Sequence, residues 1–445
     1  MCQKPSLGKS AAVESASTKS NTQTQLAKDD VWLKTFDFEG FSSEIHALGK
    51  KLEAQQGPSD VAHLEKMILW SNTLAAIGLL TMGFFRMNIL TIFCLSTFTF
   101  TRWTMIAHHT CHGGFDKIHP QNKVRWHRFK FALGSLWRRF LDWFDWMMPE
   151  AWNVEHNNRH HYHLSELDDP DLVEENLKDL RELNMPVAFK YVVIFFFMTT
   201  WKWFYYAPNT YKELKLAKLR REGKSLPAGV KPEDAITIRA ILLGQNPFYS
   251  AFEFFTVVVG PYFVFRFLIT PLPYLLLGEL GILTTLDGPT MYMTAVTNLF
   301  LAELLTNAHG FLCVVTNHAG DDMYRFRHAC RAFSGSFYLR QVLASADYYY
   351  GNDVLDFLQG FLNYQVEHHM WPSLTMKSYQ TSGPLVREIC ERYGVPYVQH
   401  NVFWRLKQTV DVMVGSANMK WFPEYYENRF LEMDAKMEAE KRKAK

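Results

Sequence analysis

The chain has 445 residues, of which 47 are basic (Lys and Arg) and 45 acidic (Asp and Glu), so its charge is nearly balanced. The chain as a whole therefore has no excess of positive charge that would favour nucleic-acid binding. The six cysteines are scattered without a C-x-x-C pair, which argues against a disulfide framework or a cysteine metal site. Aromatic residues make up 15% of the chain, an excess that suits a membrane interface.

Residues 1–60 are rich in Ser, Thr, Lys and Gln and contain no apolar run, so a cleavable secretory signal is not expected. We predict a disordered, polar N-terminal tail here. A plastid transit peptide is the alternative, because the segment is Ser-rich and poor in acidic residues at its start. The composition then changes, and we predict a membrane domain over residues 61–430.

Residues 67–85 and 88–107 are apolar runs of about the 20 residues that a helix needs to cross a bilayer. Only Arg86 and Met87 separate them, which predicts a helical hairpin. Residues 108–186 are charged and rich in histidine, so we expect them outside the lipid.

Three further apolar runs cover residues 187–206, 249–269 and 291–315. The connector 208–247 holds eight Lys or Arg residues and the connector 270–290 holds none. The positive-inside tendency places the first connector in the cytosol and the second across the membrane. The last two runs then form a second hairpin, and residues 187–206 form an interfacial helix. The predicted fold is an all-α membrane protein with four transmembrane helices in two hairpins, interfacial helices and a cytosolic helical cap.

Residues 431–445 form a charged C-terminal tail. Lys443 and Lys441 stand where a dibasic retrieval signal for the endoplasmic reticulum would lie, which favours that membrane as the location. A solvated run of charges explains the same residues.

Ten of the 17 histidines gather in three short stretches, all predicted on the cytosolic face. In the first two stretches, histidines four residues apart share one helix face and can bind one metal ion. His161 lies about 100° around the helix from His160 and can reach a second ion. The third stretch, "NYQVEHHMWP", pairs two neighbouring histidines. The candidate ligands are His108, His112, His156, His160, His161, His368 and His369.

Neutral imidazole binds iron, copper, zinc and nickel. Seven or eight such ligands exceed what one tetrahedral zinc ion uses, so the pattern predicts a site for two metal ions. Asp169 and Glu367 can accept hydrogen bonds from the second ring nitrogens of ligating histidines. The chain has no E-x-x-H motif, which disfavours a ferritin-like carboxylate site.

The stretches "HHTCH", "HNNRHH" and "QVEHH" resemble the three histidine boxes of the integral-membrane fatty acid desaturase family. The resemblance covers roughly residues 65–400. Gln365 at the start of the third box, and "DDPDL" after the second, are similar to the front-end subgroup, which places double bonds near the carboxyl end of an acyl chain. The resemblance implies two Fe²⁺ ions and O₂ as co-substrate. Gln365 would occupy a ligand position or orient a metal-bound water.

The family also takes an iron ligand from the end of its last span, where this chain offers His309 and His318. Nine residues apart, these two histidines point to opposite faces of one helix. We expect His318 to be the ligand, with Asp321 and Asp322 as its hydrogen-bond partners, and His309 to lie deeper in the bundle.

Two features depart from the front-end pattern. The chain has no H-P-G-G motif, and residues 1–60 are too short and polar for a fused cytochrome b5 domain. Electrons would therefore come from a separate donor, either cytochrome b5 with its reductase or a plastid ferredoxin. The gap between His156 and His160 is three residues, which is the less usual spacing in that subgroup.

The function that this resemblance implies is oxygen-dependent desaturation of an acyl chain carried by a lipid or by coenzyme A. A hydroxylase on the same di-iron scaffold is one alternative. A membrane lipid hydrolase that uses histidine-bound zinc is another. The implied location is the endoplasmic reticulum, with a plastid membrane as the alternative.

Overall fold

The computed structural model describes residues 26–443 apart from 227, 233–237 and 283–286. This part of the chain is helical, and its four strands are only two or three residues long. The strands pair in parallel as two separate ladders: β1 (Tyr324–Arg325) with β4 (Lys420–Trp421), and β2 (Ala346–Tyr348) with β3 (Val398–His400). The predicted all-α class is confirmed.

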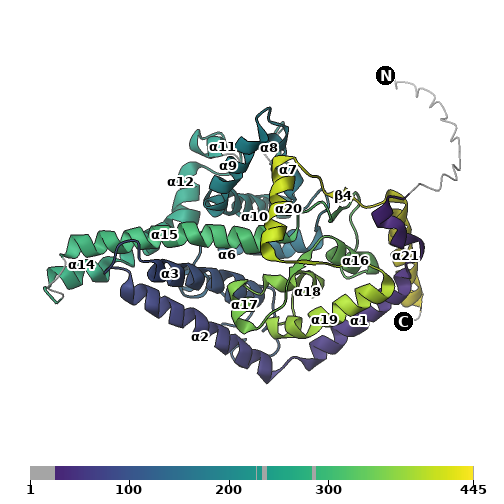
Figure 1. The fold of residues 1–445 in the computed structure, drawn as a ribbon, viewed down its shortest axis with the longest axis horizontal. Coiled ribbons are helices and arrows are strands. Elements are labelled where there is room, and N and C mark those ends of the chain that lie inside the picture. The colour runs from purple at the N-terminus through teal and green to yellow at the C-terminus, as the bar shows by residue number, and fades with distance from the viewer. Residues whose placement is uncertain (1–25, 227, 233–237, 283–286, 444–445) are drawn as a thin grey trace, which may run out of the picture.

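Three helical runs are long and apolar enough to cross a membrane, and they overlap the spans predicted at 88–107, 249–269 and 291–315. They extend over Ile89–Cys111, Ala251–Glu279 and Gly288–Asn317. Their elements are α3 (Ile89–Thr101), η2 (Arg102–Ala107) and α4 (His108–Cys111); α12 (Ala251–Glu253), η8 (Phe254–Val259), α13 (Gly260–Phe263), η9 (Val264–Ile269) and α14 (Leu272–Glu279); and α15 (Gly288–Val314) with η10 (Val315–Asn317). Figure 1 shows α14 and α15 extending away from the rest of the molecule.

The run predicted at 67–85 lies in α2 (Pro58–Thr81), which pairs with α3 as the first hairpin. Because α2 begins in polar sequence and ends at Thr81, it is not among the three runs above. The hairpin is closed by polar contacts: the hydroxyls of Thr81 and Thr91 lie 2.7 Å apart, and the Asn88 side chain caps α3. Asn298 donates hydrogen bonds to the carbonyls of Met82 and Phe85, which ties this turn to α15. Such internal pairing satisfies backbone groups that lipid cannot.

The region predicted as one interfacial helix, 187–206, is divided in two. Helix α9 (Val187–Met198) ends before a short break. The helix that follows, formed by η6 (Lys202–Tyr206) and α10 (Ala207–Arg221), makes an angle of 80° with α9. This bent pair is a fourth candidate span only if both parts are counted as one. The exposed side of α9 is apolar, as an interfacial position requires.

Within the described residues, six helical segments have π-helical hydrogen bonding, in which each turn holds about one extra residue. They are η2, η3 (Arg139–Trp143), η4 (Asn153–Asn157), η6, η8 and η9. Segment η2 directly precedes His108, and η4 contains His156. Two of the predicted histidine stretches are thus built on widened helix turns, which often occur at functional sites.

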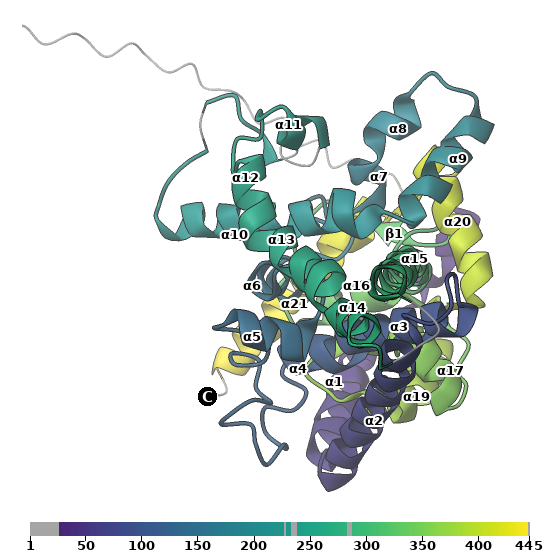
Figure 2. The same ribbon diagram turned by 90° about the vertical axis from the view of Figure 1, so that its left-hand side faces the viewer.

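The remaining helices form a cap at one end of the spans (Figure 1). Figure 2 shows α15 nearly end-on, with α1, α2 and α19 on one side of it and α9 and α10 on the other. The cap and its connections comprise η1 (Lys28–Lys34), α1 (Phe38–Gln55), α5 (Leu136–Arg138), α6 (Pro149–Trp152), η5 (His160–Tyr162), α7 (Val173–Asn176), α8 (Lys178–Glu182), α11 (Ile238–Leu242), α16 (Gly335–Leu343), α17 (Asp353–Leu358), η11 (Leu362–Tyr364), α18 (Gln365–Met370), α19 (Met376–Tyr393), α20 (Val402–Val414) and α21 (Glu424–Lys443).

The prediction of a disordered tail over residues 1–60 is wrong for its described part, residues 26–60. Helix α1 packs against α16 and α19, and the ring of Phe38 stacks on Phe430 at 4.6 Å. Phe38, Phe41 and Ile45 are among the apolar residues that recur on one face of α1 and are fully buried. A polar average composition concealed this amphipathic face. Residues 1–25 of the predicted tail lie outside the described residues.

The charged segment predicted at 431–445 is, through Lys443, the second half of α21. Its Asp434 is buried and accepts hydrogen bonds from the backbone N–H groups of Gly335 and Ser336 at the start of α16. This part of the chain is therefore attached to the cap.

Candidate metal centre

All eight histidines predicted from the sequence converge in two adjoining groups. In each group, one ring nitrogen from every member lies within 4.8 Å of those of the others. The first group is His108, His112, His156, His161 and His368, and the second is His160, His318 and His369. Three stretches far apart in the sequence, together with the end of the last span, thus meet at one place.

The elements that carry these residues explain the meeting. Spans α3–α4 and α15–η10 end at the same side of the membrane domain, and their last turns supply His108 and His318. Helix α18 of the cap brings His368 and His369 onto these ends (Figure 1). The rings of His108 and His368 have their centroids 4.5 Å apart, and those of His318 and His369 are also 4.5 Å apart.

The two groups are in direct contact. The rings of His161 and His369 stack with centroids 4.1 Å apart, one from each group. Within the first group, Nε2 of His156 lies 3.0 Å from Nε2 of His108 and 3.2 Å from Nε2 of His161. Neutral ring nitrogens this close to one another need either a shared proton or a shared cation.

Three histidines are oriented by hydrogen bonds from their Nδ1 atoms, which leave Nε2 turned to the centre. His108 bonds to the Thr104 carbonyl at 3.2 Å, and His318 to the Ala344 carbonyl at 3.1 Å. His160 bonds to the Asp169 carboxylate at 2.9 Å. Such partners fix the tautomer and the direction of a ligating ring.

Asp169 is itself held in place, because it accepts hydrogen bonds from the backbone N–H groups of Ser165 and Asp171. Gln365 lies with its Nε2 2.9 Å from Nε2 of His318, at the edge of the second group. The Glu367 carboxyl is turned elsewhere: it accepts a hydrogen bond from Tyr397 at 3.0 Å and lies beside Asp347. Burial raises the pKa of Glu367 well above its usual range.

Two expectations about neighbouring residues are settled by the geometry. His309 lies outside both groups, where its Nε2 is 2.6 Å from the Leu358 carbonyl and its ring stacks on Phe100. The expectation that Asp321 and Asp322 orient His318 is wrong. Asp322 instead pairs with Arg405, and Asp321 accepts a hydrogen bond from Gln408.

The centre contains buried ring nitrogens that make no hydrogen bond within the described part of the chain. They are Nε2 of His112, Nδ1 of His161, Nε2 of His368 and both ring nitrogens of His369. A buried polar atom without a partner costs free energy, so a cluster of them indicates a ligand that the protein alone does not supply. The donor set fits metal ions that prefer imidazole.

The protonation of the rings suits metal binding. Burial, followed by the nearby histidines, holds the pKa of His112, His156, His161, His368 and His369 well below the usual value. Burial also lowers the pKa of His318 to about 3. These rings are neutral at pH 7, which is the form that ligates a metal. His160 differs, because the Asp169 carboxylate overcomes the effect of burial and raises its pKa.

Sequence reasoning did not select three residues that the structure places at the centre. His109 is buried beside His368, with ring centroids 5.0 Å apart and both ring nitrogens unpartnered. Asp171 joins His156 and His160 in a third group of close ligand atoms. Trp152 stacks on His156 at 4.4 Å. His109 and Asp171 stood within the quoted "HHTCH" and "DDPDL" stretches, whereas no spacing pointed to Trp152.

An apolar cavity, partly open to the outside, adjoins the centre. His108, His156, His160, His318 and Gln365 form part of its wall. Most of the remaining wall is apolar and aromatic, including Trp103, Trp201, Tyr206, Phe311, Leu177, Phe197 and Met413. The cavity therefore offers a long apolar group direct access to both groups of histidines.

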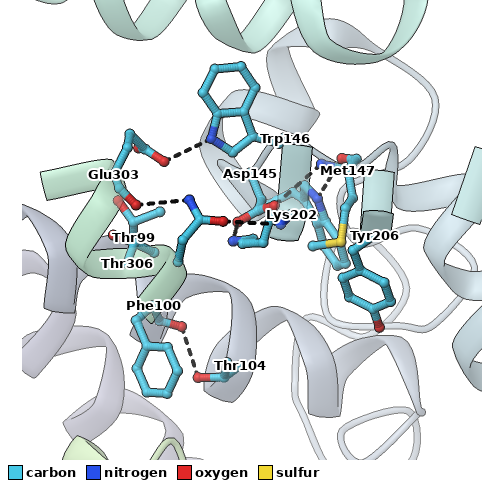
Figure 3. Close-up of polar contacts among 12 residues, drawn as sticks. Thr99, Phe100, Thr104, Asp145, Trp146, Met147, Lys202, Tyr206, Glu303 and Thr306 are labelled. Atoms are coloured by element: carbon cyan, nitrogen blue, oxygen red, sulfur yellow. Dashed lines mark hydrogen bonds and ion pairs between the residues drawn. The ribbon is translucent and has the colours of Figure 1, made fainter. Parts of the chain in front are cut away.

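A buried cluster of charged and polar residues supports the aromatic wall (Figure 3). Lys202 and Asp145 form a fully buried ion pair, and the Lys202 ammonium lies 4.3 Å from the centre of the Trp103 ring. Trp201 donates a hydrogen bond to the Asn307 carbonyl at 2.8 Å. Figure 3 also shows Trp146 directed at Glu303, with which it forms a 2.8 Å hydrogen bond. These contacts fix the position of the wall.

Comparison with known proteins agrees with this geometry. The sequence model of the fatty acid desaturase family matches residues 84–401, more than two thirds of the chain. The chain belongs to the fatty acid desaturase family. No solved structure matches it significantly.

Several curated relatives of this desaturase-family protein are themselves named as desaturases. An NADPH-dependent stearoyl-CoA 9-desaturase of Mycobacterium tuberculosis (strain ATCC 25618 / H37Rv) is 31% identical over 131 residues, which are 28% of this chain and 30% of the relative. An acyl-lipid (8-3)-desaturase of Mortierella alpina is 24% identical over 189 residues, 42% of this chain and 37% of the relative. A probable Delta(5) fatty acid desaturase C of Dictyostelium discoideum is 24% identical over 178 residues, 38% and 35% of the two chains. The matched parts thus span between 30% and 37% of the length of these relatives.

Proposed function

We propose that this protein is an oxygen-dependent desaturase that introduces a double bond into the acyl chain of a lipid or an acyl-CoA. The observation that carries the proposal is the position of two groups of histidine nitrogens in the wall of an apolar cavity. The family membership and the names of the relatives support the same activity.

The proposed cofactors are two Fe²⁺ ions, one at each group of histidines. The ligands are His108, His112, His156, His161 and His368 for one ion, and His160, His318 and His369 for the other. Bound iron supplies the activation of O₂ that is needed to remove hydrogen from an unactivated methylene chain, which no side chain can do. The overall reaction takes two hydrogens from the acyl chain and, with two electrons and two protons from outside, reduces one O₂ to two waters.

The protein's own residues have two tasks in this proposal. Thr104, Asp169 and Ala344 hold the ligating rings in one orientation through the Nδ1 hydrogen bonds described above. The aromatic wall around Trp103 and Trp201 keeps the acyl chain extended along the histidines and keeps water away from them. Gln365, beside His318, stands where it can orient a water or complete the ligand set of the second ion.

The electrons come, in this proposal, from a separate donor, either cytochrome b5 with its reductase or a ferredoxin. The endoplasmic reticulum is the proposed location, with a plastid membrane as the alternative. The front-end subgroup is the proposed regiochemistry, supported by Gln365 and by the Delta(5) and (8-3) names of two relatives.

The test is expression of the full chain in yeast, with acyl profiling of the microsomal lipids and acyl-CoA pool by mass spectrometry. We expect new unsaturated chains with the wild-type protein and none with His368→Ala. His309→Ala is the matched control, because His309 is a buried histidine outside both groups. It should keep the wild-type profile.

Three results would contradict the proposal. If the acyl profile stayed unchanged for all supplied chains, with the wild-type protein present and loaded with iron, desaturation would be ruled out as the activity. Hydroxylated chains would identify the hydroxylase alternative. Zinc in the purified protein, with lipid cleavage and no O₂ consumption, would identify the hydrolase.

A further inference from the structure

The connection between α4 and α5 is strongly basic. From Lys117 to Arg139 the sequence holds seven Lys or Arg residues and no Asp or Glu. This connection begins where the candidate span Ile89–Cys111 ends, one residue after α4. Figure 2 shows it projecting outward from the helices beside α1.

Four of the seven cations are neutralised or buried by other parts of the protein. Lys117 pairs with Glu53, Arg125 with Asp142, and Arg128 with Asp116. Arg139 is buried, and its guanidinium donates hydrogen bonds to backbone carbonyls, including that of Val257 at 3.1 Å. These four residues therefore belong to the folded structure of the connection.

The other three cations, Lys123, Lys130 and Arg138, have no acidic partner among the residues that the structure describes. They lie close together, because the Lys130 ammonium contacts the Lys123 carbonyl and Arg138 donates to the carbonyls of Lys130 and Val124. The result is a compact cluster of three positive charges that no acidic side chain of the described chain neutralises.

Each of these cations adjoins an exposed apolar residue in the sequence. Val124 is 65% exposed, Phe129 is 76%, Leu136 is 57% and Trp137 is 66%. Large apolar side chains this exposed are costly in water, and so many around one cationic cluster indicate a surface that something covers. Aromatic rings and basic residues at the end of a span are the combination found at the headgroup level of a bilayer.

We propose that these seven residues form a binding surface for anionic phospholipids, the α4–α5 anchor: Lys123, Val124, Phe129, Lys130, Leu136, Trp137 and Arg138. The three cations contact headgroup phosphates, and the apolar side chains enter the boundary between headgroups and acyl chains. An acidic protein would satisfy the charges, but it would leave four protruding apolar side chains without the medium that suits them. A lipid surface satisfies both features.

The anchor follows His112 along the chain, with residues 113–122 between them. Binding it to the membrane holds the end of α4, and with it one edge of the histidine centre, at a fixed depth. This role does not depend on which reaction the centre performs.

The experiment places the photoreactive residue p-benzoylphenylalanine at position 129 of the full-length protein. The protein is reconstituted in vesicles of phosphatidylcholine containing a minority of phosphatidylserine, irradiated, and analysed for lipid adducts by mass spectrometry. We expect adducts with lipid. The share of phosphatidylserine among them should be at least about threefold above its share in the vesicle, because cations at a membrane surface attract anionic headgroups.

The charge-reversed variant K123E/K130E/R138E should give adducts with the composition of the vesicle. K436E/K441E/K443E makes the same change of charge on α21 and should keep the enrichment. Since Arg138 also bonds to backbone carbonyls, K123E alone provides a second test. The Lys123 ammonium makes no hydrogen bond or ion pair in the described structure, so its reversal leaves the fold unchanged and should lower the enrichment in part.

Four results would overturn the proposal. The absence of lipid adducts at position 129 would place the surface in water. Adducts that have the lipid composition of the vesicle, in the protein with its natural cations, would exclude selection of anionic headgroups. Phosphatidylserine enrichment that persists in the charge-reversed variant would exclude it as well. In microsomes, adducts with a protein in place of lipid would assign the surface to an acidic protein partner.

Discussion

The histidine centre and the charged cluster around Lys202 are both buried sets of polar groups, yet they are built on opposite principles. The charged cluster contains two cations and two anions: Lys202 pairs with Asp145, and Arg266 lies 3.0 Å from Glu303. Its charges cancel within the protein, and Tyr262 and Trp146 add hydrogen bonds to Glu303. The centre consists of histidine rings, of which all but His160 lack a carboxylate partner, and several of their nitrogens make no hydrogen bond in the described chain.

The difference separates a structural cluster from a binding site. The paired charges of Lys202 with Asp145 and of Arg266 with Glu303 neutralise one another, so this cluster has no net charge to attract a further ion. Neutral donors facing one another form an open set that only a cation completes. Removing residues from the two clusters should therefore have different consequences.

The largest effect should come from the centre itself. Replacing His161 or His369 with Ala removes a ligand at the contact between the two groups. We expect desaturation to fall at least about 100-fold, since the loss of a ligand exceeds the 10- to 100-fold cost of losing its supporting partner. Product formation per iron-loaded protein, measured in microsomes, tests this. Full activity in either variant would mean that the stacked pair is not part of the metal site.

The next largest effect should come from the charged cluster, and it should concern folding. Lys202→Met leaves the fully buried Asp145 without its partner, which we expect to cost about 3–5 kcal/mol of stability. Thermal unfolding in detergent measures this loss, while the iron content of the folded fraction should not change. The double variant Lys202→Met with Asp145→Leu should regain most of the stability. If Lys202→Met instead lost iron at unchanged stability, the cluster would belong to the centre.

A smaller effect should come from the partner of His160. Asp169→Asn keeps the shape but removes the charge that holds Nδ1, and we expect metal affinity to fall about 10- to 100-fold. Glu367→Gln is the control, because its carboxyl contacts Tyr397 and Asp347. Competition with a calibrated chelator measures both. Equal losses in the two variants would show that the second carboxyl also supports the ligands.

The smallest and most gradual effect should be that of pH. The folded pKa of His318 is about 3, and those of five other ligating rings are also lowered by burial. Unfolded histidines titrate near about 6.5, so between these values the unfolded chain binds more protons than the folded one. Stability of the metal-free protein should thus fall as the pH is lowered below about 6.5, and retained iron should fall with it. Iron content after equilibration at a series of pH values checks the direction, and retention unchanged down to pH 4 would contradict it.

The candidate ligands could be predicted because the chemistry of a metal site is concentrated in a few residue types. Helical periodicity correctly placed His108 and His112 in one group. The spans near 88–107, 249–269 and 291–315 followed from hydropathy alone.

The argument from helical periodicity gave the wrong partition of the second stretch. His156 groups with His161, and His160 belongs to the group of His318 and His369. A π-helical turn followed by a 3₁₀ turn replaces the continuous α-helix that the argument assumed.

Other features depend on contacts between distant residues, which composition does not reveal. The apolar face of α1 was hidden in a polar segment because its buried apolar residues recur only every three or four positions, with polar residues between them. Lys202 lies in the run predicted as an interfacial helix, but it is fully buried and paired with Asp145, 57 residues away in the sequence. The cavity could not be seen at all, since its lining comes from helices throughout the chain.

The π-helical turns have a consequence for how this protein tolerates change. Segment η2 accommodates one residue more than an α-helix would between the span and His108. Shortening it by a single residue would turn everything that follows by about 100° and move it about 1.5 Å along the axis. The direction of the histidine rings therefore depends on the number of residues in η2. Deleting a residue from η2 should disturb these rings more than replacing one of its side chains.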